Sequence, residues 1–305
     1  MGESWSNRVA LAHRACEPEE KPWPVVVFAH DEESQIITCL ESLAKGSMAH
    51  PIYVYVLANG CNDKTEAVVR DFILDSPWVT LVSVTLGDKA NAWNVFVHDI
   101  AHRAEVYFFV DGDARVVPGS FDALYSALER SPEANAAAAI PAVGRSKKLL
   151  AQFVCEYGLI LGNLYALRGD FVLKVKQSGA RLPIGYIGED GLVTSLAKWN
   201  LDPTGPFLDE RVASCPTAQF IFRSFSPWRR QDWRAYMRRR VRYSLRHFQH
   251  ELLAPLLKST GLCGMPQTVG DLYKKQSQML RFCRPRLGSD AIFDIIAIAR
   301  MRGHR

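Results

Sequence analysis

The chain has 305 residues, of which 48% are hydrophobic and 23% are charged, and its formal net charge is +5. This length and composition predict a globular protein with a full core, large enough for one α/β domain and an appendage. The chain contains no run of roughly 18 to 20 consecutive apolar residues, so we expect no transmembrane helix.

The cysteines and the N-terminal residues predict a cytoplasmic protein. Seven cysteines are present, an odd number, and none forms a Cys-x-x-Cys pair. The first 24 residues are polar and interrupted by prolines, without the apolar centre of a secretory signal. We therefore expect reduced thiols in the cytoplasm, with peripheral contact to the inner face of the membrane left open.

The first part of the chain alternates between strand and helix patterns. Mainly apolar runs predict strands at 24–30, 52–58, 79–86 and 106–110. Apolar residues at helical spacing predict helices at 36–43, at 67–72 and from 88 to about 104. Such alternation indicates a parallel sheet that helices cover on both faces.

Further elements follow the fourth strand. We predict a helix at 121–129, a strand at 136–143, a helix at 149–161 and an extended segment at 165–168. A loop rich in Gly and Pro at 179–188 precedes a helix that begins with Glu189 and Asp190. From residue 216 the composition becomes basic and aromatic, so three regions are predicted: an N-terminal arm (1–23), an α/β domain (24–215) and a mainly helical extension (216–305).

The sequence Asp111-Gly112-Asp113 follows a strand, 106–110, that is apolar at every position. In an extended chain residues two apart point to the same side, so both carboxylates face one spot. Gly112 lets a ligand or the backbone approach closely. Two such carboxylates favour a hard cation such as Mg²⁺ or Mn²⁺. A plain Asp-Gly turn that closes the strand is the alternative.

Six short motifs occur in a fixed order at 29–33, 58–65, 88–94, 111–113, 165–168 and 188–190. The ordered set resembles the inverting glycosyltransferases of family 2, which have the GT-A fold, over roughly residues 24 to 215. The resemblance implies an α/β protein with a Rossmann-like, mostly parallel sheet flanked by helices, followed by the basic helical extension. It also implies transfer of a sugar from a nucleoside-diphosphate sugar to an acceptor hydroxyl or amine, with inversion.

The resemblance also implies roles for individual residues. The donor, with a UDP-sugar favoured, would be bordered by residues at the end of the first strand: Phe28, Ala29, His30, Asp31 and Glu32. Asn59 stands where the family commonly has an aspartate that recognises the base, and an amide cannot supply a carboxylate. Lys89 would lie near the diphosphate. Asp111 and Gly112 would also border the donor, with Asp111 in contact with the ribose or the metal.

The metal and the catalytic acids follow from the same resemblance. In this DXD motif Asp113 would hold Mg²⁺ or Mn²⁺, and Asp111 would contact the metal or the ribose. The cation would neutralise the leaving diphosphate as a Lewis acid. Asp190 is the candidate base, with Glu189 as its partner in the Glu-Asp pair. Asp63 has a structural role in its turn. The alternatives are that Glu189 and Asp190 are ordinary first-turn acids and that Lys89 is a solvated charge.

The basic segment allows a different interpretation. Gln231-Asp-Trp-Arg234 resembles part of the Gln-x-x-Arg-Trp motif of processive family members, but Ala235 replaces the Trp. The departure argues against a polysaccharide synthase and leaves Arg234 and Arg238 as candidate diphosphate ligands. A solvated helix face is the plain alternative.

Two functions from other classes stay open. Residues 229–246 could form a nucleic-acid or membrane-surface binding module, whose affinity would fall steeply with salt. For the enzyme itself no nucleic-acid partner is expected. A nucleotidyltransferase ranks last, because residues 29–34 lack the Gly-rich phosphate loop.

Overall fold

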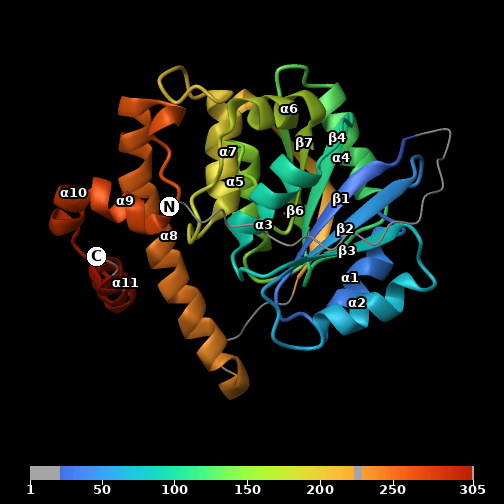
Figure 1. Ribbon diagram of the computed structural model, residues 1–305, viewed down its shortest axis with the longest axis horizontal. Coiled ribbons are helices and arrows are strands. Elements are labelled where there is room, and N and C mark those ends of the chain that lie inside the picture. The colour runs from blue at the N-terminus through green and yellow to red at the C-terminus, as the bar shows by residue number, and fades with distance from the viewer. Residues whose placement is uncertain (1–20, 223–228, 304–305) are drawn as a thin grey trace, which may run out of the picture.

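One eight-stranded sheet with helices on both faces forms the centre of the computed structural model, which describes residues 21–222 and 229–303 (Figure 1). The strand order is β3-β2-β1-β4-β7-β6-β8-β5. Strands β7 and β5 run antiparallel to their neighbours, and the others share one direction. The strands are β1 (Trp23–Ala29), β2 (Ile52–Asn59), β3 (Val79–Val84), β4 (Val106–Asp111), β5 (Arg115–Val116), β6 (Ala136–Pro141), β7 (Leu164–Arg168) and β8 (Val212–Ile221).

Each strand in the parallel half contributes alternate side chains to two separate cores. In β1, Val25 and Val27 join the core on one face, and Val26 and Phe28 join the core on the other. The first core is covered by α1 (Ile36–Leu43), α2 (Thr65–Ile73) and α4 (Ser120–Glu129). The second is covered by α3 (Lys89–Val95), η1 (Phe96–Ile100), α5 (Lys147–Tyr157), α6 (Gly169–Ser178) and α7 (Glu189–Trp199).

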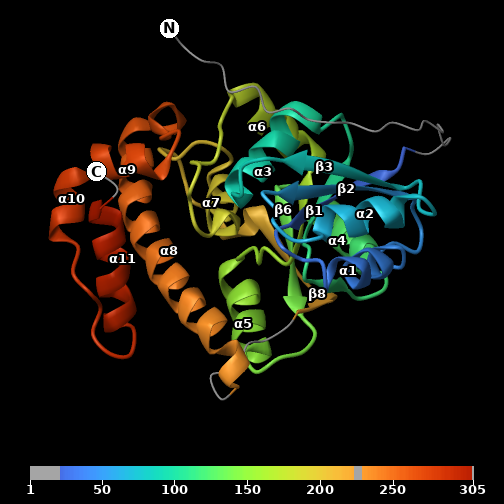
Figure 2. The ribbon, with the colours of Figure 1, turned by 60° about the horizontal axis from the view of Figure 1, so that its bottom comes forward.

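The C-terminal helices stand beside α7 and α5, away from the sheet (Figure 2). The longest helix, α8 (Trp233–Thr260), packs against α11 (Ala291–Gly303). Near the start of α11 the buried Asp294 pairs with Arg286 at 2.7 Å. The remaining elements are η2 (Asp209–Arg211), η3 (Arg230–Asp232), η4 (Leu262–Gly264), α9 (Val269–Lys275) and α10 (Ser277–Phe282).

The extension is attached to the α/β domain through a buried side chain of α8. The backbone N–H of Ile187 donates to Gln249 Oε1 at 2.7 Å, and Gln249 Nε2 donates to Tyr273 Oη at 2.8 Å. Because an unpaired buried amide is costly, this pair of contacts fixes the 179–188 loop against α8 and α9. Among the described residues, no helix combines the length and the apolarity needed to cross a bilayer.

The structure corrects several predicted boundaries. The predicted helix from 88 to about 104 ends at Ile100, where its last turn is a π-helix, and the predicted helix 149–161 is Lys147–Tyr157. Strand β8 was not predicted, because Pro216 and Thr217 interrupt its apolar pattern, and it crosses the predicted boundary between 215 and 216. Helix α6 was not predicted either. Residues 1–20 of the predicted arm lie outside the described residues.

Candidate active site

The site begins where β4 ends. Asp111 is the last residue of β4, which lies between β1 and β7 in the sheet. The N–H of Gly112 donates to the carbonyl of Phe28 at 2.8 Å, and a Cβ at this glycine would lie 3.0 Å from that oxygen. The missing side chain therefore lets the Asp-Gly-Asp turn lie directly on the end of β1.

Negative charge accumulates at this end of the sheet. Burial, together with the nearby carboxylates of Asp113 and Asp111, raises the pKa of Glu32 to about 7. Burial also raises the pKa of Asp111 to about 7, against the opposing effect of Lys89 and with the help of Asp113. Burial and like charges disfavour the ionised carboxylates, so a bound cation would stabilise them. These hard oxygen donors fit Mg²⁺ or Mn²⁺.

A second group of acids has a structural explanation. Asp31, Cys61 and Asp63 bring their ligand atoms within 4.8 Å of one another. The carboxylate of Asp63 accepts hydrogen bonds from the N–H groups of Glu33 and Thr65, at 3.0 and 2.9 Å. Asp31 accepts one from the N–H of Asn62 at 2.7 Å. These bonds join the β1 and β2 loops, so Asp63 has the turn role expected of it.

Lys89 links the two halves of the site. It begins α3, whose N-cap Asp88 accepts from the N–H of Asn91 at 2.7 Å. Its ammonium contacts Asp111 Oδ1 and lies 2.6 Å from Glu189 Oε1. Burial opposes the charge, but the two carboxylates outweigh it and hold the pKa of Lys89 well above its usual value. Lys89 is therefore an ion-paired residue of the site, and not a solvated charge.

The carboxylate of Asp190 is held in place from three directions. It accepts from the N–H of Gly191 at 2.9 Å and from the N–H of Gly162 at 3.2 Å. Arg246 of α8 lies 3.2 Å from Asp190 Oδ1, through Nη2. The neighbouring Asp190 carboxylate raises the pKa of Arg246 above its ordinary value. The first turn of α7 thus presents Glu189 to Lys89 and Asp190 to the C-terminal extension.

The predicted nucleotide residues line the ends of β1 and β2. Asn59 is buried, and its Nδ2 donates to the carbonyl of Ala29 at 2.8 Å. His30 Nδ1 lies 2.7 Å from the carbonyl of Asn59. The Asn59 amide therefore joins two strands, while its loop stays at the same sheet edge as Phe28 and Glu32.

The basic segment contributes a residue that the sequence did not single out. Arg234 and Arg238 are exposed on the first turns of α8. Arg246 lies two to three turns further along and is the arginine that contacts Asp190. The sequence also missed Asn163, whose Nδ2 donates to Asp111 Oδ2 at 3.3 Å. Both contacts depend on packing between distant segments, and no local pattern marks them.

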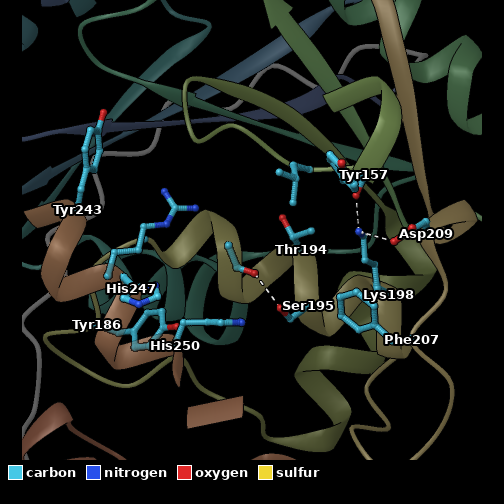
Figure 3. A pocket seen from close by; sticks show the side chains of 14 residues that line it. Tyr157, Tyr186, Thr194, Ser195, Lys198, Phe207, Asp209, Tyr243, His247 and His250 are labelled. Atoms are coloured by element: carbon cyan, nitrogen blue, oxygen red, sulfur yellow. Dashed lines mark hydrogen bonds and ion pairs between the residues drawn. The ribbon is translucent and has the colours of Figure 1, made fainter. Parts of the chain in front are cut away.

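A cavity of about 630 Å³ opens beside Asp190, between α7 and α8. Figure 3 shows Tyr243, His247 and His250 of α8 on one side, and Lys198 of α7 with Phe207 on the other. Gly188, Gly191, Thr194 and Ser195 lie along the α7 side. The site therefore joins an acidic sheet edge to a cavity with a basic and aromatic lining.

A comparison with known protein families supports the resemblance that the six motifs show to family 2 glycosyltransferases. Residues 25–172 match the model of Glycosyl transferase family 2. The chain carries a glycosyl transferase family 2 domain. No curated protein sequence matches the chain.

Solved structures of glycosyltransferases share the fold of this family 2 domain. Mannosyltransferase PcManGT from Pyrobaculum calidifontis, in complex with GDP-Man and Mn²⁺, aligns with a TM-score of 0.58 at 18% identity, over 98% of this chain and 89% of that one. Glucosyl-3-phosphoglycerate synthase from Mycobacterium tuberculosis, with Mn²⁺ and UDP-glucose, aligns with a TM-score of 0.50 at 18% identity, over 75% and 82% of the two chains. The predicted GT-A fold with a C-terminal helical extension is therefore confirmed.

Proposed function

We propose that this protein transfers a sugar from a nucleoside-diphosphate sugar to an acceptor hydroxyl or amine, with inversion and with the help of a divalent cation. The observation that carries the proposal is the cluster of Glu32, Asp111, Asp113 and Lys89 at the carboxyl ends of β1 and β4, next to Asp190. In open α/β sheets this edge is where ligands bind. The bound nucleotide sugars and Mn²⁺ of the two structural neighbours support the same substrate class.

On the donor side, Asp113 and Asp111 would hold Mg²⁺ or Mn²⁺, which neutralises charge on the leaving diphosphate. Phe28 to Glu32 and the Asn59 loop would border the nucleoside. The base stays open between uracil and guanine: the sequence favoured a UDP-sugar, while the two neighbours bind GDP-Man and UDP-glucose.

On the acceptor side, Asp190 is proposed as the base. The acceptor oxygen attacks the anomeric carbon, its proton passes to the Asp190 carboxylate, and the electrons of the breaking C–O bond go to the diphosphate. Attack opposite the leaving group inverts the anomeric centre. Glu189, held by Lys89 at 2.6 Å, would keep the first turn of α7 in position for this step.

We also propose that the C-terminal extension belongs to the enzyme's site. Arg246 pairs with Asp190, and Arg240 pairs with Asp290 of the same extension. Two arginines of the 229–246 segment are thus used inside the protein, which weakens the case for a separate nucleic-acid or membrane module. Steep salt dependence of binding would favour the module instead.

Product analysis tests the proposal. The protein would be incubated with UDP- and GDP-sugars and Mn²⁺, and the released nucleoside diphosphate would be measured. Water can replace the acceptor in this assay. We expect one class of donor to release nucleoside diphosphate, and EDTA to stop this release. The anomeric proton signal in the NMR spectrum should show that the product has the inverted anomeric configuration. Absence of release from every sugar nucleotide, with folded protein, would contradict the proposal.

A further inference from the structure

The cavity beside Asp190 is built from one face of each of two helices. Gly188, Gly191, Ser195 and Lys198 follow each other at helical spacing along the start and body of α7. Opposite them, α8 presents a second row at the same kind of spacing: Tyr243, Arg246, His247 and His250. Residues three and four apart share a helix face, so the two rows form facing walls. Tyr157, Phe207 and Asp209 close one end (Figure 3).

The Arg246 side chain lines the cavity and also contacts Asp190, the candidate base. Its side chain crosses Gly188 and Gly191, where an added Cβ would lie 2.5 Å from Arg246 Cδ and 2.9 Å from Nη2. Because the two glycines have no side chains, the Arg246 side chain can pass over them and its guanidinium reaches Asp190. The Arg246 side chain is 39% exposed, so the guanidinium also faces open space.

Asp190 does not depend on Arg246 for its orientation. The N–H groups of Gly191 and Gly162 donate to its two oxygens. A guanidinium presents five donors, and a planar anion can be bound by two of them at once. Arg246 can therefore turn toward an anion in the cavity while the base stays aimed by two backbone donors.

The rest of the lining is suited to a small, hydroxylated anion. Lys198 is almost fully buried and pairs with Asp209 at 2.7 Å, the one carboxylate among the described lining residues. His247 and His250 add hydrogen-bonding groups near Arg246. Tyr243 and Phe207 are about half exposed and offer apolar ring faces for a carbon skeleton.

We propose that this cavity binds the acceptor, and that the acceptor carries an oxyanion, a phosphate or a carboxylate, which takes Arg246 away from Asp190. This inference rests on the proposed function. While Arg246 pairs with Asp190, its guanidinium occupies carboxylate oxygen Oδ1 and competes with the acceptor hydroxyl for Asp190. Binding of the oxyanion frees Asp190 to accept the proton of the acceptor hydroxyl. The acceptor oxygen then bonds to the anomeric carbon, and the diphosphate leaves with the electrons of the broken bond.

Anion binding can be measured without a donor. Inorganic phosphate and acetate would be titrated into the full-length protein by calorimetry, with Arg246→Gln, Arg246→Lys and Lys258→Gln as variants. Lys258 is exposed on the same helix, so its variant removes an equal charge away from the cavity. We expect about tenfold weaker binding in Arg246→Gln, a smaller loss in Arg246→Lys and no change in Lys258→Gln. Equal binding by wild type and Arg246→Gln would overturn the proposal.

Transfer kinetics provide the second arm and separate the two sources of the oxyanion. One donor would be offered matched phosphorylated, carboxylated and neutral polyol acceptors. We expect the wild type to use the phosphorylated or the carboxylated acceptor, and Arg246→Gln to raise its KM at least about tenfold. Tyr243 is about half exposed, so Tyr243→Ala should keep the fold, and it should also raise the KM of the acceptor.

The outcomes distinguish this inference from the proposed function. If neutral acceptors are used equally well and Arg246→Gln leaves KM unchanged, the oxyanion acceptor is wrong while sugar transfer stands. If Mn²⁺-dependent release of nucleoside diphosphate is missing with every donor, sugar transfer itself is wrong.

Discussion

The acidic sheet edge and the α7–α8 cavity differ in how the chain builds them. The edge is made where strands end, so Glu32, Lys89 and Asp111 come from the ends of β1, β3 and β4 in the family 2 domain. The cavity is made by two helices that lie far apart in the chain and includes residues outside the matched segment 25–172. The sheet edge, our proposed donor site, can stay the same in such a fold while the helices that line the proposed acceptor cavity vary.

Substitution of Asp190 should have the largest effect, because it removes the proposed base, which lies where the two regions meet. Asp190→Asn keeps the shape of the side chain but cannot take a proton. We expect kcat to fall about 10³-fold, within the usual range for a general base. Nucleotide binding in the presence of Mn²⁺ should survive, as measured by calorimetry. Loss of binding with an intact fold would contradict the assignment of Asp190 as base.

Lys89→Gln should destabilise the acidic edge. The substitution leaves Asp111 and Glu189 without their shared cation. Removal of one partner of a buried pair costs about 3–5 kcal/mol, and the partial exposure of Lys89 reduces this to about 2–3 kcal/mol. Urea unfolding would measure the loss, with Lys45→Gln, at an exposed lysine, as control. A change below about 0.5 kcal/mol would show that the ion pairs add nothing to the fold.

A pair of glycine substitutions should separate the two regions. Gly112→Ala places a Cβ 3.0 Å from the carbonyl of Phe28 and should weaken nucleotide binding in the presence of Mn²⁺. Gly188→Ala introduces a Cβ at a φ of +86° and 2.5 Å from Arg246, so it should raise the KM of the acceptor. Each should cost about 1–2 kcal/mol in stability. If both variants weaken nucleotide binding, or both raise the KM of the acceptor, the two regions do not act separately.

The pH dependence of stability should report the acidic edge with a smaller effect. Asp111 and Glu32 have pKa values of about 7, above their ordinary values of 3.8 and 4.5. Between these limits the folded protein binds more protons than the unfolded chain, so stability falls as pH rises from about 4 through about 7.

The effect is best measured as a difference between variants. In EDTA, Glu32→Gln should flatten the fall in Tm across this range, by about 2–4 °C relative to the wild type. Mn²⁺ should raise the wild-type Tm more at pH 8 than at pH 5, because ionised carboxylates bind the cation. An identical pH profile of Tm in the two proteins would contradict the charge cluster.

Local sequence patterns could predict the acidic edge but not the cavity. An apolar strand that ends in an acid places that acid at a known edge of a parallel sheet, which is how Asp111 was identified. Nothing local distinguishes Arg246, which contacts Asp190, from the exposed Arg238, because the difference arises only when α8 packs beside α7. The same applies to β8, whose place beside β6 depends on long-range pairing.

Lys89 illustrates a partial success. Its position after β3, at the start of a helix, predicted a cation turned toward an anion. The structure pairs it with two carboxylates, that of Asp111 and that of Glu189, which lies 100 residues further along the chain. The sequence could indicate that the side chain turns toward an anion, but not which carboxylates it pairs with.

Nucleotide binding with and without a metal tests the central claim most directly. Thermal shifts would be recorded for UDP, GDP and their sugars, with Mn²⁺ or with EDTA, on the wild type and on Asp113→Asn. The account predicts that one nucleotide raises the Tm of the wild type only with Mn²⁺, and that Asp113→Asn abolishes this rise. Stabilisation that is independent of Mn²⁺, or unchanged in Asp113→Asn, would contradict a metal-held sugar nucleotide at the end of β4.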